Sequence, residues 1–137
     1  MKYMFVYGTL RAGEINDINL AADSNGIARP RHLGLTTLAG RLFDFGTYPG
    51  MVAESADAQS TVVGDVYEID DALLAVLDEI EQVYPGVDDL FVSEEVDIEV
   101  QGERIACLYY PVAPAAVAGR SEIEGGDWVA HRRARII

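Results

Sequence analysis

Short hydrophobic stretches with the two-residue alternation of β-strands recur along most of the chain. The first stretch, residues 3–7, is rich in aromatic and branched side chains and ends at a Gly-Thr turn. Further strands are predicted over residues 35–45, 50–54, 61–69, 91–100 and 104–112. The last two strands flank Gln101-Gly102-Glu103, a pattern typical of a β-hairpin. The chain is therefore predicted to consist mainly of β-strands.

One clear helix interrupts this β pattern. Asp70 is a suitable N-cap residue, and the apolar residues after it recur with the helical period as far as Glu81 or Gln82. Residues 83–90 contain proline and glycine, which end the helix.

Two further helical segments are expected to be short. Residues 11–31 are predicted to form a long loop with a helical turn near residues 18–22. Asp127 is a candidate cap for a final helix. Because the sequence shows no repeat or linker, we expect a single domain over residues 1–137.

Composition excludes several classes of function. The net charge of −13 repels phosphate groups, which argues against nucleic acid and anionic membranes as partners. No apolar stretch approaches the roughly 18 residues that a membrane span needs. The opening residues lack the apolar core and cleavage site of a signal peptide. We therefore expect a soluble, cytoplasmic protein.

Side chains that bind metals or act as nucleophiles are scarce. Cys107 is the only cysteine, which excludes an internal disulfide, and its apolar neighbours favour a buried structural thiol. Only two histidines are present, and the sequence has no phosphate-loop, dinucleotide-binding or G-x-S-x-G motif. We therefore expect no metal, no cofactor and no covalent intermediate.

Glu81 is the first candidate for acid–base chemistry. At about 100° per residue, Glu81 lies about 40° from Leu77, inside the apolar stripe of the helix, whereas Glu79 points away from it. The negative end of the helix macrodipole and partial burial would both raise the pKa of Glu81, which suits a general acid or base. The alternative is that Glu81 turns into solvent at the helix end, as acidic residues there usually do.

The segment Tyr7-Gly8-Thr9-Leu10-Arg11 is the second candidate site. Where a strand ends in glycine, the following backbone N–H groups can face a cavity without a Cβ in the way. Such N–H groups bind carboxylates and carbonyl oxygens. An ordinary turn at the end of a strand is the alternative interpretation.

Five short motifs follow one another in a characteristic order. Residues 7–11 read Y-G-T-L-R, and residues 77–81 read L-D-E-I-E, an L-D-x-x-E pattern. Between these two motifs lie Gly40–Asp44 with Tyr48–Gly50 and then Val63–Tyr67, and Gly126–Trp128 comes last. In this order and spacing they resemble the γ-glutamylcyclotransferase-like (AIG2-like) family, whose last glutamate in L-D-x-x-E is catalytic. The resemblance spans most of the chain, apart chiefly from residues 11–33 and 112–124.

The resemblance implies an α+β fold, in which a small mixed β-barrel-like sheet has one main helix packed on it. It also implies a cofactor-free γ-glutamylcyclotransferase that cyclises the γ-glutamyl group of a small-molecule amine or peptide to 5-oxoproline and releases the amine. Glu81 would be the general acid and base. The implied substrate-binding residues are Tyr7, Gly8, Thr9, Leu10 and Tyr109. For the pocket tyrosine, Tyr110 on the opposite strand face is left open as the alternative to Tyr109.

Two departures from the family pattern keep other functions open. Gln82 stands where members often have glycine, and residues 91–93 read Phe-Val-Ser where members often have Tyr-x-Arg. One alternative is therefore a non-catalytic member that binds a small γ-glutamyl or amino-acid-like ligand. Another is an enzyme of a biosynthetic pathway that removes the acyl group from a larger amine. The identity of the amine and the oligomeric state are left open.

Overall fold

The computed structural model describes residues 2–11, 13–14, 17–46, 48–54, 59–82 and 94–134, and of residues 80–82 the backbone only. The strands are β1 (Lys2–Val6), β2 (Arg31–Asp44), β3 (Pro49–Ala53), β4 (Thr61–Ile69), β5 (Glu94–Val100), β6 (Glu103–Tyr109) and β7 (Ser121–Glu122). The helices are α1 (Ile18–Ser24), α2 (Asp71–Gln82) and α3 (Trp128–Ala134), with a 3₁₀ turn η1 at Pro114–Val117.

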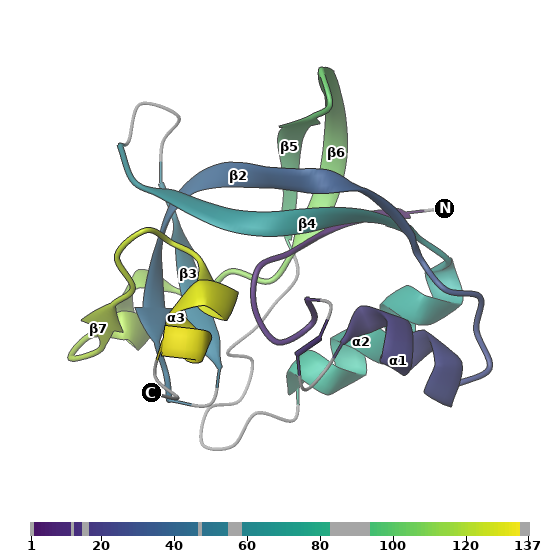
Figure 1. The fold of residues 1–137 in the computed structure, drawn as a ribbon, viewed down its shortest axis with the longest axis horizontal. Coiled ribbons are helices and arrows are strands. Elements are labelled where there is room, and N and C mark those ends of the chain that lie inside the picture. The colour runs from purple at the N-terminus through teal and green to yellow at the C-terminus, as the bar shows by residue number, and fades with distance from the viewer. Residues whose placement is uncertain are drawn as a thin grey trace.

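The strands form one curled mixed sheet in the order β3-β2-β4-β1-β6-β5, and β7 also pairs with β2. All pairs are antiparallel except β1 with β6. The long strand β2 pairs with β4 over residues 31–39 and with β3 over residues 40–44. Although β2 and β5 are not neighbours in the sheet, the hydroxyl of Thr36 donates to the carbonyl of Glu99 at 2.8 Å. The sheet therefore closes into a half-barrel (Figure 1).

Both faces of the sheet are buried. On β1, Met4 and Val6 belong to one hydrophobic cluster, whereas Phe5 and Tyr7 belong to another. The first cluster joins the sheet to α1 and α2 and contains Met4, Val6, Leu10, Ile18, Ala22, Tyr48, Tyr67, Ile69, Leu73, Leu77, Tyr110 and Val112. The second contains Phe5, Tyr7, Leu42, Met51, Val62, Val66, Ile98, Val100, Cys107, Tyr109, Ile123 and Trp128. Burial of such side chains contributes roughly 1.5–3 kcal/mol each, so both clusters stabilise the fold.

The main helix, α2, begins where its sequence predicts. The carboxylate of Asp70 accepts from the N–H of Ala72 at 3.1 Å, which satisfies one of the first N–H groups of the helix. Leu73 and Leu77 are completely buried and pack in the first cluster. In Figure 1, α1 and α2 lie together below one end of β4, while α3 lies beside β3 towards the other end. Within the described residues, no helix is both long and apolar enough to cross a membrane.

The predicted α+β fold with a barrel-like sheet is confirmed, and β4 has the predicted bounds. The hairpin between β5 and β6 is confirmed as a two-residue turn, in which Gln101 and Gly102 both have positive φ. The predicted start of β2 is four residues late, because the pairing with β4 continues through a β-bulge between His32 and Gly34. The predicted strand residues 91–93 lie outside the described part of the chain.

Candidate active site

The loop after β1 lies between α3 and α2 in the middle of the molecule (Figure 1). Its turn closes with the N–H of Arg11 donating to the carbonyl of Gly8 at 3.1 Å. A Cβ built on Gly8 would lie 2.7 Å from Cγ of Pro49, which is closer than side chains approach one another. Glycine at this position therefore allows the loop backbone to pack directly on the segment that begins β3.

The hydroxyl of Tyr7 connects the ends of three strands. It donates to the carbonyl of Tyr110 at 2.5 Å and accepts from the N–H of Met51 at 3.2 Å. Tyr7 is only 5% exposed. The end of β1 is therefore fixed to β3 and to the residue that follows β6.

The two tyrosines considered for the pocket lie in different places. Tyr109 packs in the cluster with Phe5, and burial together with the carboxylate of Glu94 raises the pKa of its hydroxyl. Tyr110 packs in the cluster with α2, where its hydroxyl donates to Oδ1 of Asp78 at 2.5 Å. Of the two hydroxyls, that of Tyr110 is therefore the one joined to the helix that carries Glu81.

Glu81 belongs to the last turn of α2, and only its backbone is described. It follows Leu77 by four residues and Asp78 by three. Around the helix, its Cα therefore lies about 40° from that of Leu77 and about 60° from that of Asp78. Leu77 is buried and Asp78 is half-buried, while Glu79 is exposed. The backbone of α2 thus places position 81 on the side of the helix that faces the sheet.

Sequence reasoning assigned no role to Asp78, although it named the residue as part of the L-D-x-x-E pattern. The available signal was the spacing, because residues three apart on a helix are neighbours on its surface. The sequence does not choose between Tyr109 and Tyr110 for a related reason. Alternation separates the two tyrosines but does not say which face of the strand meets α2.

Arg11 joins three of the sequence motifs. Its Nε donates to Oδ2 of Asp65 on β4, and its Nη1 donates to Oδ1 of Asp127, each at 2.9 Å. Asp127 in turn caps α3 through the N–H of Ala130 at 3.2 Å. The Arg11 side chain is only 11% exposed, so these hydrogen-bonded ion pairs lie in a partly desolvated environment.

A second ion pair fixes the same loop to α3. The guanidinium of Arg132 donates to both carboxylate oxygens of Glu14, at 2.7 and 2.6 Å, and Glu14 is buried. His131 of the same helix lies 2.9 Å from Oδ2 of Asp44 on β2. His131 and Arg132 of α3 therefore both have acidic partners within the fold.

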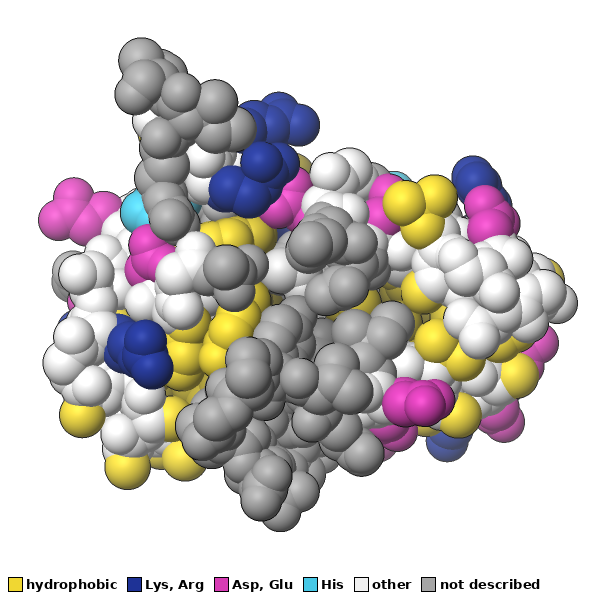
Figure 2. Space-filling view, turned by 90° about the horizontal axis from the view of Figure 1, so that it is seen from below, with side chains coloured by type: hydrophobic (Ala, Val, Ile, Leu, Met, Phe, Trp, Pro, Cys, Tyr) yellow, Lys and Arg dark blue, Asp and Glu magenta, His cyan; other side chains and the backbone are white. Residues whose placement is uncertain are grey.

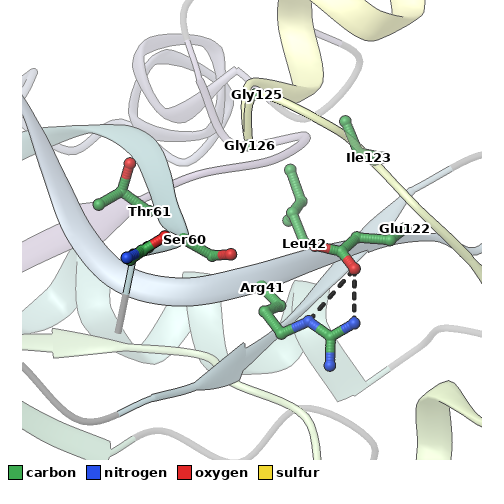
Figure 3. A pocket seen from close by; sticks show the side chains of 9 residues that line it. Arg41, Leu42, Ser60, Thr61, Glu122, Ile123, Gly125 and Gly126 are labelled. Carbon is green, nitrogen blue, oxygen red and sulfur yellow. Dashed lines mark hydrogen bonds and ion pairs between the residues drawn. The ribbon is translucent and has the colours of Figure 1, made fainter. Parts of the chain in front are cut away.

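A pocket of about 240 Å³ lies between β2, the start of β4 and the turn after β7 (Figure 3). On its rim, Arg41 donates to Oε1 of Glu122 at 2.5 Å through Nη2 and at 3.2 Å through Nε. Its lining consists of Arg41, Leu42, Gln59, Ser60, Thr61, Glu122, Ile123, Gly125 and Gly126. None of the predicted site residues lines this pocket.

Of the predicted site residues, Gly8, Thr9 and Leu10 form the loop after β1 with Tyr7 at its start, Tyr109 packs in the second cluster, and of Glu81 only the backbone is described. On the face seen from below in Figure 2, hydrophobic side chains are visible both in the half that carries α3 and in the half that carries α1. In the described part of the chain, no three histidine, cysteine or acidic side chains are grouped as metal ligands. The expectation of a site without metal or cofactor stays a prediction.

The fold and the loop at the end of β1 define a class of α+β protein with a half-barrel sheet. YkqA of Bacillus subtilis has this fold, with a TM-score of 0.71 over 98% of this chain and 42% of that chain, at 24% identity. A mouse AIG2-like protein also has it, with a TM-score of 0.64 over 84% of this chain and 81% of that chain, at 23% identity.

The sequence matches the family described as "Gamma-glutamyl cyclotransferase, AIG2-like" over residues 4–130, and the chain belongs to this family. In sequence, YkqA is 33% identical over 131 residues, 94% of this chain and 42% of YkqA. The gamma-L-glutamyl-butirosin B gamma-glutamyl cyclotransferase of Niallia circulans is 31% identical over 73% of this chain and 58% of that enzyme. The gamma-glutamylaminecyclotransferase of Rattus norvegicus is 27% identical over 85% of this chain and 81% of that enzyme. The chain thus spans only about half the length of two of these relatives.

Proposed function

We propose that this chain is a γ-glutamylcyclotransferase-type enzyme that acts on γ-glutamyl amines or peptides, with Glu81 as general acid and base. The observation that carries the proposal is a chain of hydrogen bonds through Tyr7, Tyr110 and Asp78, which joins the loop at residues 7–10 to the last turns of α2. Family membership supports the cyclotransferase activity, and two similar proteins are named for reactions of this type.

In the first step of the proposed reaction, the neutral α-amine of the substrate attacks the γ-carbonyl carbon of the same molecule. A C–N bond forms and closes a five-membered ring, while the carbonyl oxygen becomes an oxyanion. The carboxylate of Glu81 takes a proton from the attacking nitrogen. Because the nucleophile and the carbonyl belong to one molecule, the main requirement is that they are held in a reactive geometry.

In the second step, the tetrahedral intermediate collapses and the bond to the leaving nitrogen breaks. Glu81 donates its proton to that nitrogen, so that the amine leaves in neutral form and the carboxylate is restored. The products are 5-oxoproline and the free amine. No water, redox partner or covalent enzyme intermediate enters this balance.

The loop after β1 supplies the groups that would hold the substrate carboxylate or the oxyanion. Within the described residues, the backbone N–H groups of Gly8 and Leu10 have no acceptor, although both residues are buried. Buried N–H groups without an acceptor are costly, and a bound anion would satisfy them. Thr9 between them is also buried. We assign Tyr7 the task of fixing this loop, because its hydroxyl bonds within the protein.

The test is release of 5-oxoproline from a panel of γ-glutamyl amines, γ-glutamyl dipeptides and glutathione, measured by chromatography. Glu81→Gln keeps the shape of the side chain and removes the proton acceptor, so kcat should fall by about 10²–10⁴-fold. The matched control is Glu79→Gln, because Glu79 lies on the exposed side of the same helix. This control should keep the activity of the unaltered protein.

Each other outcome has a definite meaning. Equal turnover in the Glu81→Gln variant and the unaltered protein would refute Glu81 as the acid and base. A folded protein that binds panel compounds, as measured by calorimetry, without releasing 5-oxoproline would favour the non-catalytic binding function.

A further inference from the structure

A series of hydrogen bonds, through both backbone and side-chain groups, runs from the core to the last turns of α2. It starts at the N–H of Met51, passes through the hydroxyl of Tyr7 to the carbonyl of Tyr110, and continues from the hydroxyl of Tyr110 to Asp78. Tyr7 and Tyr110 are 5% and 4% exposed, so solvent competes little for these bonds. Bonds from a neutral donor to a carboxylate are also stronger than bonds between neutral groups.

The end of α2 needs a stabilising contact from outside the helix, because its own acidic residues destabilise the helical conformation there. Asp78, Glu79 and Glu81 all lie in its last turns, at the end where the macrodipole is negative, and no basic residue is present there. Negative charges at a helix C-terminus are unfavourable. Helix ends also fray, since their last carbonyl groups have no partner inside the helix. A donor from outside the helix to Asp78 offsets both effects.

We propose that Asp78 and Tyr110 are positioning residues for the reaction: their hydrogen bond holds the last turn of α2, and with it Glu81, against the loop at residues 7–10. This inference rests on the proposed function. Tyr110 is suited to this task because its carbonyl accepts from the hydroxyl of Tyr7, which follows β1 and begins that loop. One residue after β6 therefore fixes both halves of the site relative to each other.

The geometry predicts which part of catalysis the pair affects. A shift of about 1 Å in a catalytic group costs about 10²-fold in rate. The binding groups at residues 7–10 belong to a different element, so substrate affinity depends less on the end of α2. Loss of the hydrogen bond should therefore lower kcat and leave KM nearly unchanged.

The experiment compares Tyr110→Phe, Asp78→Ala, Asp78→Asn and the double variant Tyr110→Phe/Asp78→Ala in the 5-oxoproline assay. Tyr110→Phe and Asp78→Ala should each lower kcat by about 10–100-fold, with KM changed less than about threefold. Asp78→Asn keeps an acceptor oxygen and should recover most of the activity. Because each single variant breaks the same hydrogen bond, the kcat of the double variant should be little lower than that of either single variant. The matched control, Tyr3→Phe, removes the hydroxyl of a tyrosine that packs against the second cluster and has no role in the site, and it should be nearly silent.

A second measurement reports how firmly the end of α2 is held and does not depend on catalysis. Amide hydrogen exchange in the last turn of α2 should become faster in Tyr110→Phe and Asp78→Ala, and should not change in Tyr3→Phe. The conservative changes Tyr110→Phe and Asp78→Asn keep the buried volume, so these variants should fold. Fluorescence of the buried Trp128 verifies the fold of each variant.

The positioning role and the proposed function fail in different ways. Loss of turnover in Glu81→Gln with unchanged kcat in Asp78→Ala and Tyr110→Phe would refute the positioning role and leave the proposed function standing. A change in KM alone, or an equal loss of kcat in Tyr3→Phe, would also refute it. Absence of turnover from the unaltered, folded protein across the panel would refute both proposals.

Discussion

Replacement of Arg11 by methionine should destabilise the protein by about 3 kcal/mol. Breaking a buried ion pair by removing one partner typically costs about 3–5 kcal/mol, because the other charge stays desolvated. Here the change leaves Asp65, whose side chain is 14% exposed, without its guanidinium partner, and it removes a second pair with Asp127. We expect the lower end of the range, because Asp127 is 34% exposed and water can solvate it again.

Urea unfolding followed by fluorescence measures this change. Trp128 is the only tryptophan, is 1% exposed and begins α3 directly after Asp127, so its emission reports the region that Arg11 holds. With a typical urea dependence of about 2 kcal/mol per M, a loss of about 3 kcal/mol lowers the midpoint by about 1.5 M. The urea midpoint of Arg11→Lys should lie between those of the unaltered protein and Arg11→Met, because one ammonium group does not reproduce the planar, two-sided geometry of a guanidinium.

The matched control is Arg29→Met. Arg29 also pairs with an aspartate, Asp23, but the two side chains are 61% and 45% exposed. Exposed pairs contribute little to stability, so its urea midpoint should not change measurably. Equal midpoints for Arg11→Met and Arg29→Met would refute the argument that partial burial makes the Arg11 pairs important.

Three further outcomes are expected. Burial raises the pKa of the Cys107 thiol to about 11. The native protein should therefore resist alkylation at about pH 8. The stability that the protonated thiol contributes below its usual pKa of 9.0 should be lost as pH rises to about 11. Urea unfolding at several pH values would detect this loss. Gly126→Ala should lower the urea midpoint far more than Gly119→Ala, because both have positive φ but a Cβ at Gly126 would lie 1.9 Å from a carbonyl oxygen of β4. Gly8→Ala should raise KM for the panel substrates and also lower the urea midpoint, because its Cβ would lie 2.7 Å from Cγ of Pro49 and would push the loop away from the start of β3.

Much of the fold is predictable because local signals agree with it. Residues 61–69 are rich in branched side chains, and Asp70 then caps a helix with a regular apolar stripe, so β4 and the start of α2 follow directly from the sequence. The early start of β2 is not predictable in the same way. A bulge between His32 and Gly34 breaks the alternation, and pairing with β4 outweighs the weak local preference there.

The candidate site shows the same division. Helical period alone predicts that Glu81 lies on the inner side of α2, and the Gly-Thr turn alone predicts an N–H-rich loop. Alternation also separates Tyr109 from Tyr110, but both faces of this sheet are buried, so burial does not reveal which tyrosine meets the helix. The partners of Arg11, residues 65 and 127, are more than 50 positions away in sequence, and such contacts depend on the complete topology.

The order of strands along the chain has a consequence for synthesis. β1 lies in the middle of the sheet, yet Lys2 pairs with Ile69 of β4, and Met4 pairs with Leu108 of β6. At roughly 5–20 residues per second, an apolar strand would leave the ribosome roughly 5–20 s before its last neighbour is made. During that interval its hydrogen-bonding groups have no strand to pair with, and both its faces are exposed. The yield of folded protein in a cell should therefore depend on the supply of chaperones that shield nascent chains, independently of how stable the finished domain is.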